Sequence, residues 1–334
     1  MHKLAALEEA RRDAANHGGE LDKDLRAMTP RADGGDQTAR QRPLALRERV
    51  EAAIAVLFFR ALGALPLDWA SALGGAIART IGPLLPVTRL ARQNLALALP
   101  ELSPAQARRI IRAMWESFGR TIAEYPHLQD ISCLGPRARI ELAGTEHLDR
   151  AVAAGRPIIF FSGHFGNWEV ASLASAQYGL RMAPVYRAAN NPRVDALMRD
   201  LRRSLGVEPL AKGAAGARRI IAAIRDGKTL AMLIDQRMND GIPVPFFGRD
   251  AMTAPALAEL ALRYDCTLLP ARVDRLDGAR FRLTVFPPLP LPRSGDRRAD
   301  ISAIMTEANR VLEAWIRERP ERWLWLHRRW PRSP

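Results

Sequence analysis

The stretch PIIFFSGHFGNWEVASLASAQYG, residues 157–179, decides the fold. Its opening run, PIIFFS, is almost entirely apolar, which predicts a strand buried on both faces. The segment WEVASLASAQYG then predicts a helix that ends at Gly179. His164 lies in the loop between the strand and the helix, and Glu169 lies in the first turn of the helix. An ionisable pair therefore follows the end of a buried strand.

The same alternation of strands and helices continues on both sides of this stretch. Apolar runs that predict strands lie at residues 138–144, 183–187, 229–235, 266–276 and 281–286, and helical patterns lie at 146–155, 192–206, 216–227, 254–265 and 301–319. Alternation of this kind predicts an α/β fold with a mostly parallel central sheet flanked by helices. The Asp277-Gly278 turn predicts one antiparallel hairpin late in the chain.

Three segments of different composition precede or make up this fold. Residues 1–45 are polar and predict a disordered leader without the apolar core of a secretory signal peptide. Residues 46–100 predict hydrophobic helices, and residues 101–334 predict the α/β domain. Its first helix is expected after Ser103, because Ser103 and Gln106 form the pattern of a capping box.

The hydrophobic helices indicate attachment to a membrane. Arg60 and Pro66 interrupt the apolar run, so two amphipathic helices in the membrane interface fit better than a spanning helix. A marginal span over residues 48–66, with Arg60 reaching the interface, remains an alternative. Helices packed on a soluble core are the third interpretation.

The chain is strongly basic, with 50 Lys and Arg against 36 Asp and Glu and a net charge of +14. Such a surface attracts anionic lipids, acidic proteins or nucleic acid. A non-enzymatic basic binder is therefore a competing class. No RRM, KH or helix-turn-helix pattern supports it, so no nucleic-acid partner is expected.

His164 and Glu169 have the spacing of a general base and its orienting carboxylate. The first helical turn can bring Glu169 back against one imidazole nitrogen and leave the other free to take a proton from a hydroxyl. A zinc site would need a further ligand in an H-E-x-x-H-like pattern, and a serine nucleophile would need G-x-S-x-G. A purely structural histidine is the remaining alternative.

These residues also carry a resemblance to a known family. His164-x4-Glu169 is similar to the H-x4-D/E signature of the glycerolipid acyltransferases, and the chain from Val50 to Trp330 resembles the bacterial lipid A biosynthesis (lauroyl/myristoyl) acyltransferases. Five ordered blocks carry it: RQNLALALPEL, SGHFGNWE, VYRAANNPRVDALMRDLRRSLG, LIDQ with VPFFGRDAMTAPALA, and ERWLWLHRRW.

The resemblance implies a glycerolipid acyltransferase-like fold and transfer of a fatty acyl chain from acyl carrier protein to a hydroxyl of a lipid A precursor. His164 would deprotonate that hydroxyl, and Glu169 would orient the ring. Asn167 or backbone amides of residues 163–167 would stabilise the oxyanion. Arg187 and Arg202 would bind phosphates or sugar acids of the acceptor.

Further matching residues are expected to wall the acyl and donor side of the cleft: Asp235, Gln236, Phe246, Phe247, Gly248 and Thr253. The alternatives are ordinary core positions for the two phenylalanines, a helix N-cap for Thr253 and a structural carboxylate for Asp235. His327 is expected to pack or hydrogen-bond locally and not to be catalytic. Arg328, Arg329 and three nearby tryptophans suggest an interfacial belt. No metal or cofactor is expected. The expected location is the cytoplasmic face of the inner membrane. A same-fold acyltransferase acting on a lysophospholipid, ornithine lipid or phosphatidylinositol mannoside is the alternative.

Overall fold

The computed structural model describes residues 46–331. Its main feature is a seven-stranded sheet in the order β1-β9-β8-β2-β5-β3-β4. The strands are β1 (Ile140–Ala143), β2 (Ile158–Ser162), β3 (Met182–Tyr186), β4 (Leu210–Ala211), β5 (Thr229–Leu233), β8 (Thr267–Arg275) and β9 (Phe281–Val285). Within this seven-stranded sheet only β8 and β9 pair antiparallel, so the predicted mostly parallel sheet and its late hairpin are confirmed.

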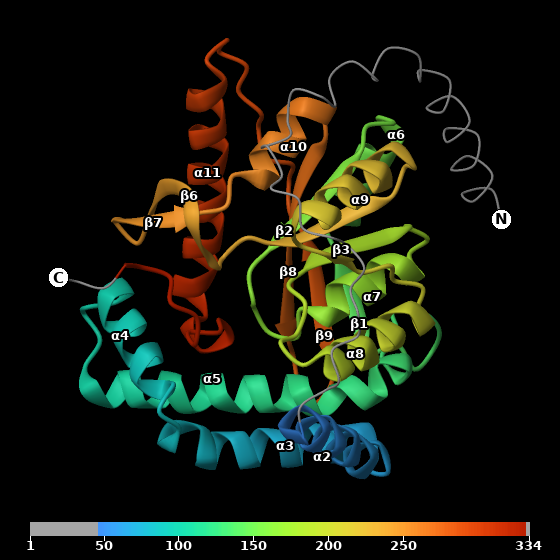
Figure 1. The fold of residues 1–334 in the computed structure, drawn as a ribbon, viewed down its shortest axis with the longest axis vertical. Coiled ribbons are helices and arrows are strands. Elements are labelled where there is room, and N and C mark those ends of the chain that lie inside the picture. The colour runs from blue at the N-terminus through green and yellow to red at the C-terminus, as the bar shows by residue number, and fades with distance from the viewer. Residues whose placement is uncertain (1–45, 332–334) are drawn as a thin grey trace.

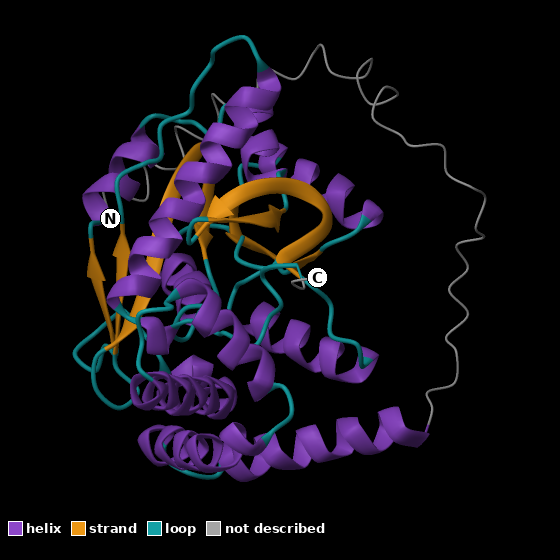
Figure 2. Ribbon diagram, turned by 90° about the vertical axis from the view of Figure 1, so that its left-hand side faces the viewer, coloured by secondary structure: helices purple, strands orange, loops and turns teal. Residues whose placement is uncertain are grey.

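Helices cover both faces of this sheet (Figure 2). One face carries α6 (Thr145–Ala153), α7 (Glu169–Gln177) and α8 (Pro192–Ser204), and the other carries α9 (Ala214–Arg225), α10 (Ala256–Tyr264) and α11 (Arg297–Glu318). In β2, the Phe160 side chain packs in the core on the α6–α8 face of the sheet, and the Phe161 side chain packs in the core on the α9–α11 face. A strand that is buried on both faces needs a continuous apolar run, which is why PIIFFS is apolar throughout.

One hairpin was not predicted from the sequence. Strands β6 (Arg237–Phe246) and β7 (Arg249–Thr253) pair antiparallel outside the main sheet and lie beside α11 (Figure 1). The turn between them is Phe247-Gly248, and both residues have positive φ, 53° and 68°. A two-residue turn of this hand normally shows Asn-Gly or Asp-Gly, a signal that Phe247 hides.

The N-terminal part of the described chain is helical. It contains α2 (Leu46–Gly63), α3 (Leu67–Ile81), the short η2 (Gly82–Leu84), α4 (Thr88–Ala98) and α5 (Pro104–Glu124). α5 runs across one end of the sheet, and α3 packs along its outer side (Figure 1). The capping box at Ser103 and Gln106 is present, as predicted.

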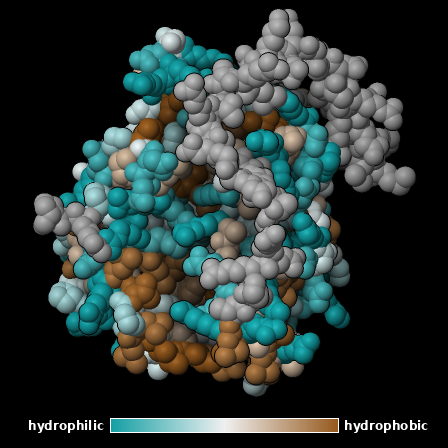
Figure 3. All heavy atoms as spheres, viewed as in Figure 1, coloured by the Kyte–Doolittle hydropathy of each residue, from teal (hydrophilic) through white to brown (hydrophobic). Residues whose placement is uncertain are grey.

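These N-terminal helices expose many large apolar side chains (Figure 3). On α3 they form one stripe, because Trp69, Leu73 and Ile77 recur every fourth residue and are 73%, 46% and 44% exposed. Within residues 46–331 no helix is long and apolar enough to cross a membrane. The leader predicted over residues 1–45 lies outside the described residues.

Candidate active site

A cavity of about 590 Å³ opens at the carboxyl ends of β2, β3 and β5. Much of its wall is apolar and comes from the sheet, α7 and α8, with Phe160, Ala171, Met182, Met198, Ala231 and Val273 among the lining residues. Its polar rim includes His164, Arg187, Lys212, Gln236 and His327. The cavity therefore combines an apolar wall with a cluster of ionisable groups, and it lies at the carboxyl ends of parallel strands, where such sheets usually bind ligands.

The His164 imidazole is held by Asp235. Its Nδ1 lies 2.8 Å from Asp235 Oδ1, and its backbone N–H donates to Asp235 Oδ2 at 2.7 Å. The sheet dictates this pairing, because Ser162 is in register with Leu233 on the neighbouring strand. Two residues further along both strands bring His164 opposite Asp235.

Asp235 fixes the protonation of the ring. Burial alone would raise the pKa of this carboxyl, but the charge and hydrogen bonds of His164, together with the Trp323 indole N–H at 2.7 Å, hold the pKa far below its usual value. An ionised carboxylate only accepts hydrogen bonds, so Nδ1 carries the proton of this contact, and Nε2 is the ring nitrogen that can exchange a proton with a substrate. His164 lines the cavity, and Nε2 is the ring nitrogen available to act as a base there.

The loop that carries His164 can take its path only because of its glycines. A Cβ on Gly163 would lie 3.1 Å from Asp235 Oδ2, and a Cβ on Gly166, whose φ is +58°, would lie 2.6 Å from the Val273 carbonyl oxygen. The amides of His164, Phe165 and Gly166 all donate to protein acceptors. These three amides are therefore not free to stabilise an oxyanion, contrary to one of the expectations for residues 163–167.

The expectation that Glu169 contacts the imidazole is wrong. Both Glu169 carboxylate oxygens accept from Arg202, Oε2 from Nε at 2.9 Å and Oε1 from the terminal nitrogen at 2.6 Å. The Tyr125 hydroxyl also donates to Oε1 at 2.8 Å. Glu169 begins α7, and this helix directs its side chain toward α8, which carries Arg202.

The Glu169–Arg202 pair is a buried ion pair in the cavity wall. The two side chains are 8% and 14% exposed. Burial alone would raise the pKa of Glu169, but Arg202 and Tyr125 lower it below its usual value. The Arg202 guanidinium also lies over the Tyr186 ring at 5.3 Å. Arg202 is thus already paired with a carboxylate, which removes the reason for expecting it to bind acceptor phosphates.

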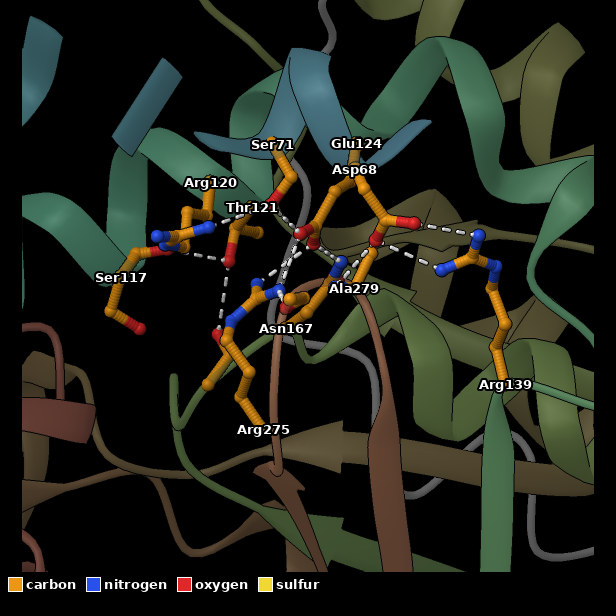
Figure 4. Close-up of polar contacts among 12 residues, drawn as sticks. Asp68, Ser71, Ser117, Arg120, Thr121, Glu124, Arg139, Asn167, Arg275 and Ala279 are labelled. Atoms are coloured by element: carbon orange, nitrogen blue, oxygen red, sulfur yellow. Dashed lines mark hydrogen bonds and ion pairs between the residues drawn. The ribbon is translucent and has the colours of Figure 1, made fainter. Parts of the chain in front are cut away.

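Asn167 is likewise engaged within the protein and fully buried. Its Nδ2 donates to Glu124 Oε2 at 2.8 Å, and its Oδ1 accepts from the Glu169 amide. Figure 4 shows that Glu124 gathers Ser71 of α3, Asn167 of the loop and Arg275 of β8 around one carboxylate. The Asn167 side chain therefore ties the loop to α5 and does not face the cavity, which corrects its expected role as an oxyanion donor or substrate contact.

Gln236 and His327 lie beside the free nitrogen of His164. Gln236 Nε2 is 3.4 Å from His164 Nε2 and 3.3 Å from His327 Nε2. The two imidazole ring centroids are 5.0 Å apart, so the local hydrogen bond expected of His327 is present and places its ring beside His164. Burial, with the charges of His164 and Arg187, lowers the pKa of His327 to about 4. At neutral pH His327 is therefore uncharged beside His164.

The residues expected to wall the cleft from the second aromatic block lie elsewhere. Phe247 and Gly248 form the turn of the β6–β7 hairpin, and the Phe247 amide donates to Glu313 of α11 at 2.7 Å. Phe246 packs against Trp330 within the core. Thr253 is fully buried and accepts a hydrogen bond from Arg329. The described residues that line the cavity include none of these four.

The predicted interfacial belt near the C-terminus is also wrong. Trp323, Trp325 and Trp330 are at most 3% exposed, and Arg329 is fully buried. The segment instead packs on the loop that carries His164: the Leu324 amide donates to the His164 carbonyl, and the Gly166 amide donates to the Arg322 carbonyl. Aromatic residues next to arginine are typical of both interfaces and cores, so the pattern alone did not separate the two.

Comparison with known proteins gives one consistent family. The chain matches the family described as bacterial lipid A biosynthesis acyltransferase over residues 40–332. It is 29% identical over 261 residues to the lipid A biosynthesis lauroyltransferase of Escherichia coli (strain K12), which covers 74% of this chain and 79% of the relative.

Two further relatives have similar coverage. The lipid A biosynthesis myristoyltransferase of Escherichia coli (strain K12) is 26% identical over 71% of this chain and 73% of its own length. The phosphatidylinositol mannoside acyltransferase of Mycobacterium tuberculosis (strain ATCC 25618 / H37Rv) is 27% identical over 72% of this chain and 76% of its own. Since the family match spans nearly the whole described chain, this protein belongs to the bacterial lipid A biosynthesis acyltransferases and is an acyl-transferring enzyme.

Proposed function

We propose that this enzyme transfers a fatty acyl chain from the thioester of acyl carrier protein to a hydroxyl of a lipid A precursor, in a late acylation of lipopolysaccharide biosynthesis. The observation that carries the proposal is the His164–Asp235 pair at the mouth of an apolar cavity. An acyl chain needs such a chamber, and the hydroxyl needs a base beside the thioester carbon.

The proposed reaction uses the free Nε2 of His164. As the acceptor oxygen attacks the thioester carbonyl carbon, its proton passes to Nε2, and Asp235 stabilises the imidazolium. The tetrahedral intermediate then expels the thiolate, which takes the proton back. The products are an ester and the free thiol of the carrier. The Gln236 carboxamide, which borders Nε2, is the side-chain donor that we assign to the oxyanion.

Neutral His327 fits this mechanism. A second imidazolium 5.0 Å from His164 would oppose the charge that the base acquires. Glu169 contributes differently from the expectation, because it positions Arg202 and the α7–α8 wall of the cavity and makes no contact with the reacting nitrogen.

Replacement of the base tests the proposal. His164→Ala should abolish acyl transfer from acyl carrier protein to a purified lipid A precursor while leaving the protein folded, as judged by its circular dichroism spectrum. His147→Ala on α6 is the matched control, because His147 does not line the cavity, and it should keep wild-type turnover. Near-wild-type turnover in His164→Ala would contradict the mechanism.

The acceptor itself needs a separate test, because one relative is named a phosphatidylinositol mannoside acyltransferase. Mass spectrometry of lipid A from a deletion strain should show the loss of one secondary acyl chain. Unchanged lipid A, with a missing acyl chain on another lipid, would favour the alternative acceptor.

We also propose that the enzyme works on the cytoplasmic face of the inner membrane and docks through the exposed apolar side chains of α2 and α3. Phe58 of α2 is exposed, while its neighbour Phe59 lines the cavity. The docking surface thus borders the cavity, so a lipid substrate would have a short path from the bilayer.

Vesicle flotation tests this docking surface. Trp69→Gln/Ile77→Gln should lose binding to vesicles of anionic phospholipid, whereas Leu134→Gln, which removes an exposed apolar side chain elsewhere, should bind normally. Equal flotation of both variants would contradict docking through α3.

A further inference from the structure

Two cations at the rim of the cavity have no carboxylate partner. The cavity wall contains Arg187, Arg202 and Lys212. Arg202 is neutralised by Glu169, as described above. Within residues 46–331, neither Arg187 nor Lys212 lies within ion-pair distance of an acidic side chain.

The sheet brings these two side chains together. Tyr186 of β3 pairs with Ala211 of β4, and the strands run parallel. Arg187 and Lys212 are the next residue on each strand, and the Lys212 amide donates to the Tyr186 carbonyl at 2.8 Å. Both cations therefore follow the carboxyl ends of their strands, and they lie at the same end of the sheet as His164.

Their proximity has an electrostatic cost. Although Lys212 is exposed overall, the protein around it desolvates its ammonium and lowers its pKa. The Asp235 charge opposes this effect, and repulsion by Arg187 adds to it, so that the pKa of Lys212 stays below its ordinary value. Arg187 also contributes to the low pKa of His327, so its field reaches the catalytic groups. A bound anion would offset the repulsion between the two cations.

We propose that Arg187 and Lys212 form an anion site at the mouth of the cavity and that this site binds a phosphate group of one of the two substrates. The proposal rests on the acyl transfer proposed above, and it adds Lys212, which the sequence patterns did not single out. A phosphate is the expected group because a guanidinium grips two of its oxygens while an ammonium supplies a point charge.

The phosphate has two possible sources. One is a phosphate ester on the lipid A precursor, and the other is the phosphodiester of the phosphopantetheine arm on acyl carrier protein. The site chemistry is the same for both, so kinetics with substrates that lack one phosphate at a time must distinguish them.

The test uses the double variant Arg187→Gln/Lys212→Gln, called the rim variant. Its matched control is the double variant Arg218→Gln/Lys228→Gln, which removes two cations that do not line the cavity. The KM for one substrate should rise about ten- to one-hundred-fold in the rim variant, with kcat much less affected, as for loss of hydrogen bonds to a charged group. The control should keep the wild-type KM values.

Phosphate-free substrates then assign the source. If the acceptor phosphate is bound, a dephosphorylated acceptor should give the wild type and the rim variant equal acceptor KM values. If the carrier arm is bound, acyl-pantetheine should remove the difference that acyl-phosphopantetheine shows. Unchanged KM values for both substrates, or an increase that persists without either phosphate, would overturn the anion site.

A binding measurement keeps this test independent of acyl transfer. Calorimetric titration with inorganic pyrophosphate at low ionic strength should show binding to the wild type that weakens at least about ten-fold in the rim variant. Absence of acyl transfer by the wild type would refute the proposed function alone, because the pyrophosphate titration would still report on the site. Equal pyrophosphate binding by both proteins would refute the anion site.

Discussion

Two buried carboxylates flank the cavity and differ in what they hold. Asp235 grips an imidazole that can gain and lose a proton, whereas Glu169 grips a guanidinium that stays charged. In both cases a cationic or polar partner outweighs the cost of burial and lowers the carboxyl pKa. The contrast teaches that a depressed pKa marks a paired carboxylate, and that the partner decides whether the pair serves chemistry or architecture.

Asp235→Asn should have the largest effect on activity. The amide keeps the size of the side chain but no longer fixes the Nδ1-protonated ring or stabilises the imidazolium. We expect kcat to fall about 10³- to 10⁴-fold, measured in single-turnover acyl transfer. A fall of less than ten-fold would mean that Asp235 is not the orienting carboxylate.

Glu169→Gln should act mainly on stability. It leaves Arg202 buried without a counter-charge, so the free energy of unfolding should fall by about 3–5 kcal/mol in denaturant titrations. Glu169→Gln/Arg202→Met removes both charges and should recover most of that loss. The pH dependence of kcat should shift in Asp235→Asn and not in Glu169→Gln; the opposite result would restore Glu169 as the partner of the base.

His327→Gln should change how stability depends on pH. The pKa of His327 is about 4 in the folded protein against an ordinary 6.5. Between these values the unfolded chain binds a proton that the folded chain does not, so wild-type stability falls as the pH is lowered from 6.5 to 4.

The variant should lack this contribution, which amounts to at most roughly 3 kcal/mol. Denaturant titrations of both proteins across this range measure the difference. Parallel curves for the wild type and the variant would contradict a neutral, half-buried His327.

Arg282→Gln should have the smallest effect. Arg282 pairs with Glu141 at 2.9 Å, within normal ion-pair distance, but both side chains are about half exposed, at 50% and 47%. Solvent screens such a pair, so the free energy of unfolding should change by less than about 1 kcal/mol. A loss comparable to that of Glu169→Gln would show that burial does not separate the two classes of pair.

The sequence predicted the sheet better than the site. Continuous apolar strands and glycine-ended helices carry their own signals, and so β2, α7 and the β8–β9 hairpin were foreseen. Side-chain partners depend on which strands become neighbours, and Asp235 meets His164 only because β5 lies beside β2 in register. A signal was present, since both residues follow strand ends. The sequence spacing of Glu169 was the more conspicuous pattern, and it indicated the wrong carboxylate.

Nitrogen-15 NMR of histidine-labelled enzyme tests most directly whether Asp235 holds the His164 ring, with the His164 signals assigned from a His164→Gln sample. We expect a hydrogen-bonded Nδ1 proton on His164 in the wild type. It should persist in Glu169→Gln and vanish in Asp235→Asn. An Nε2-protonated ring in the wild type, or a signal lost with Glu169 and retained without the Asp235 charge, would contradict the assignment of Asp235 as the partner of the base.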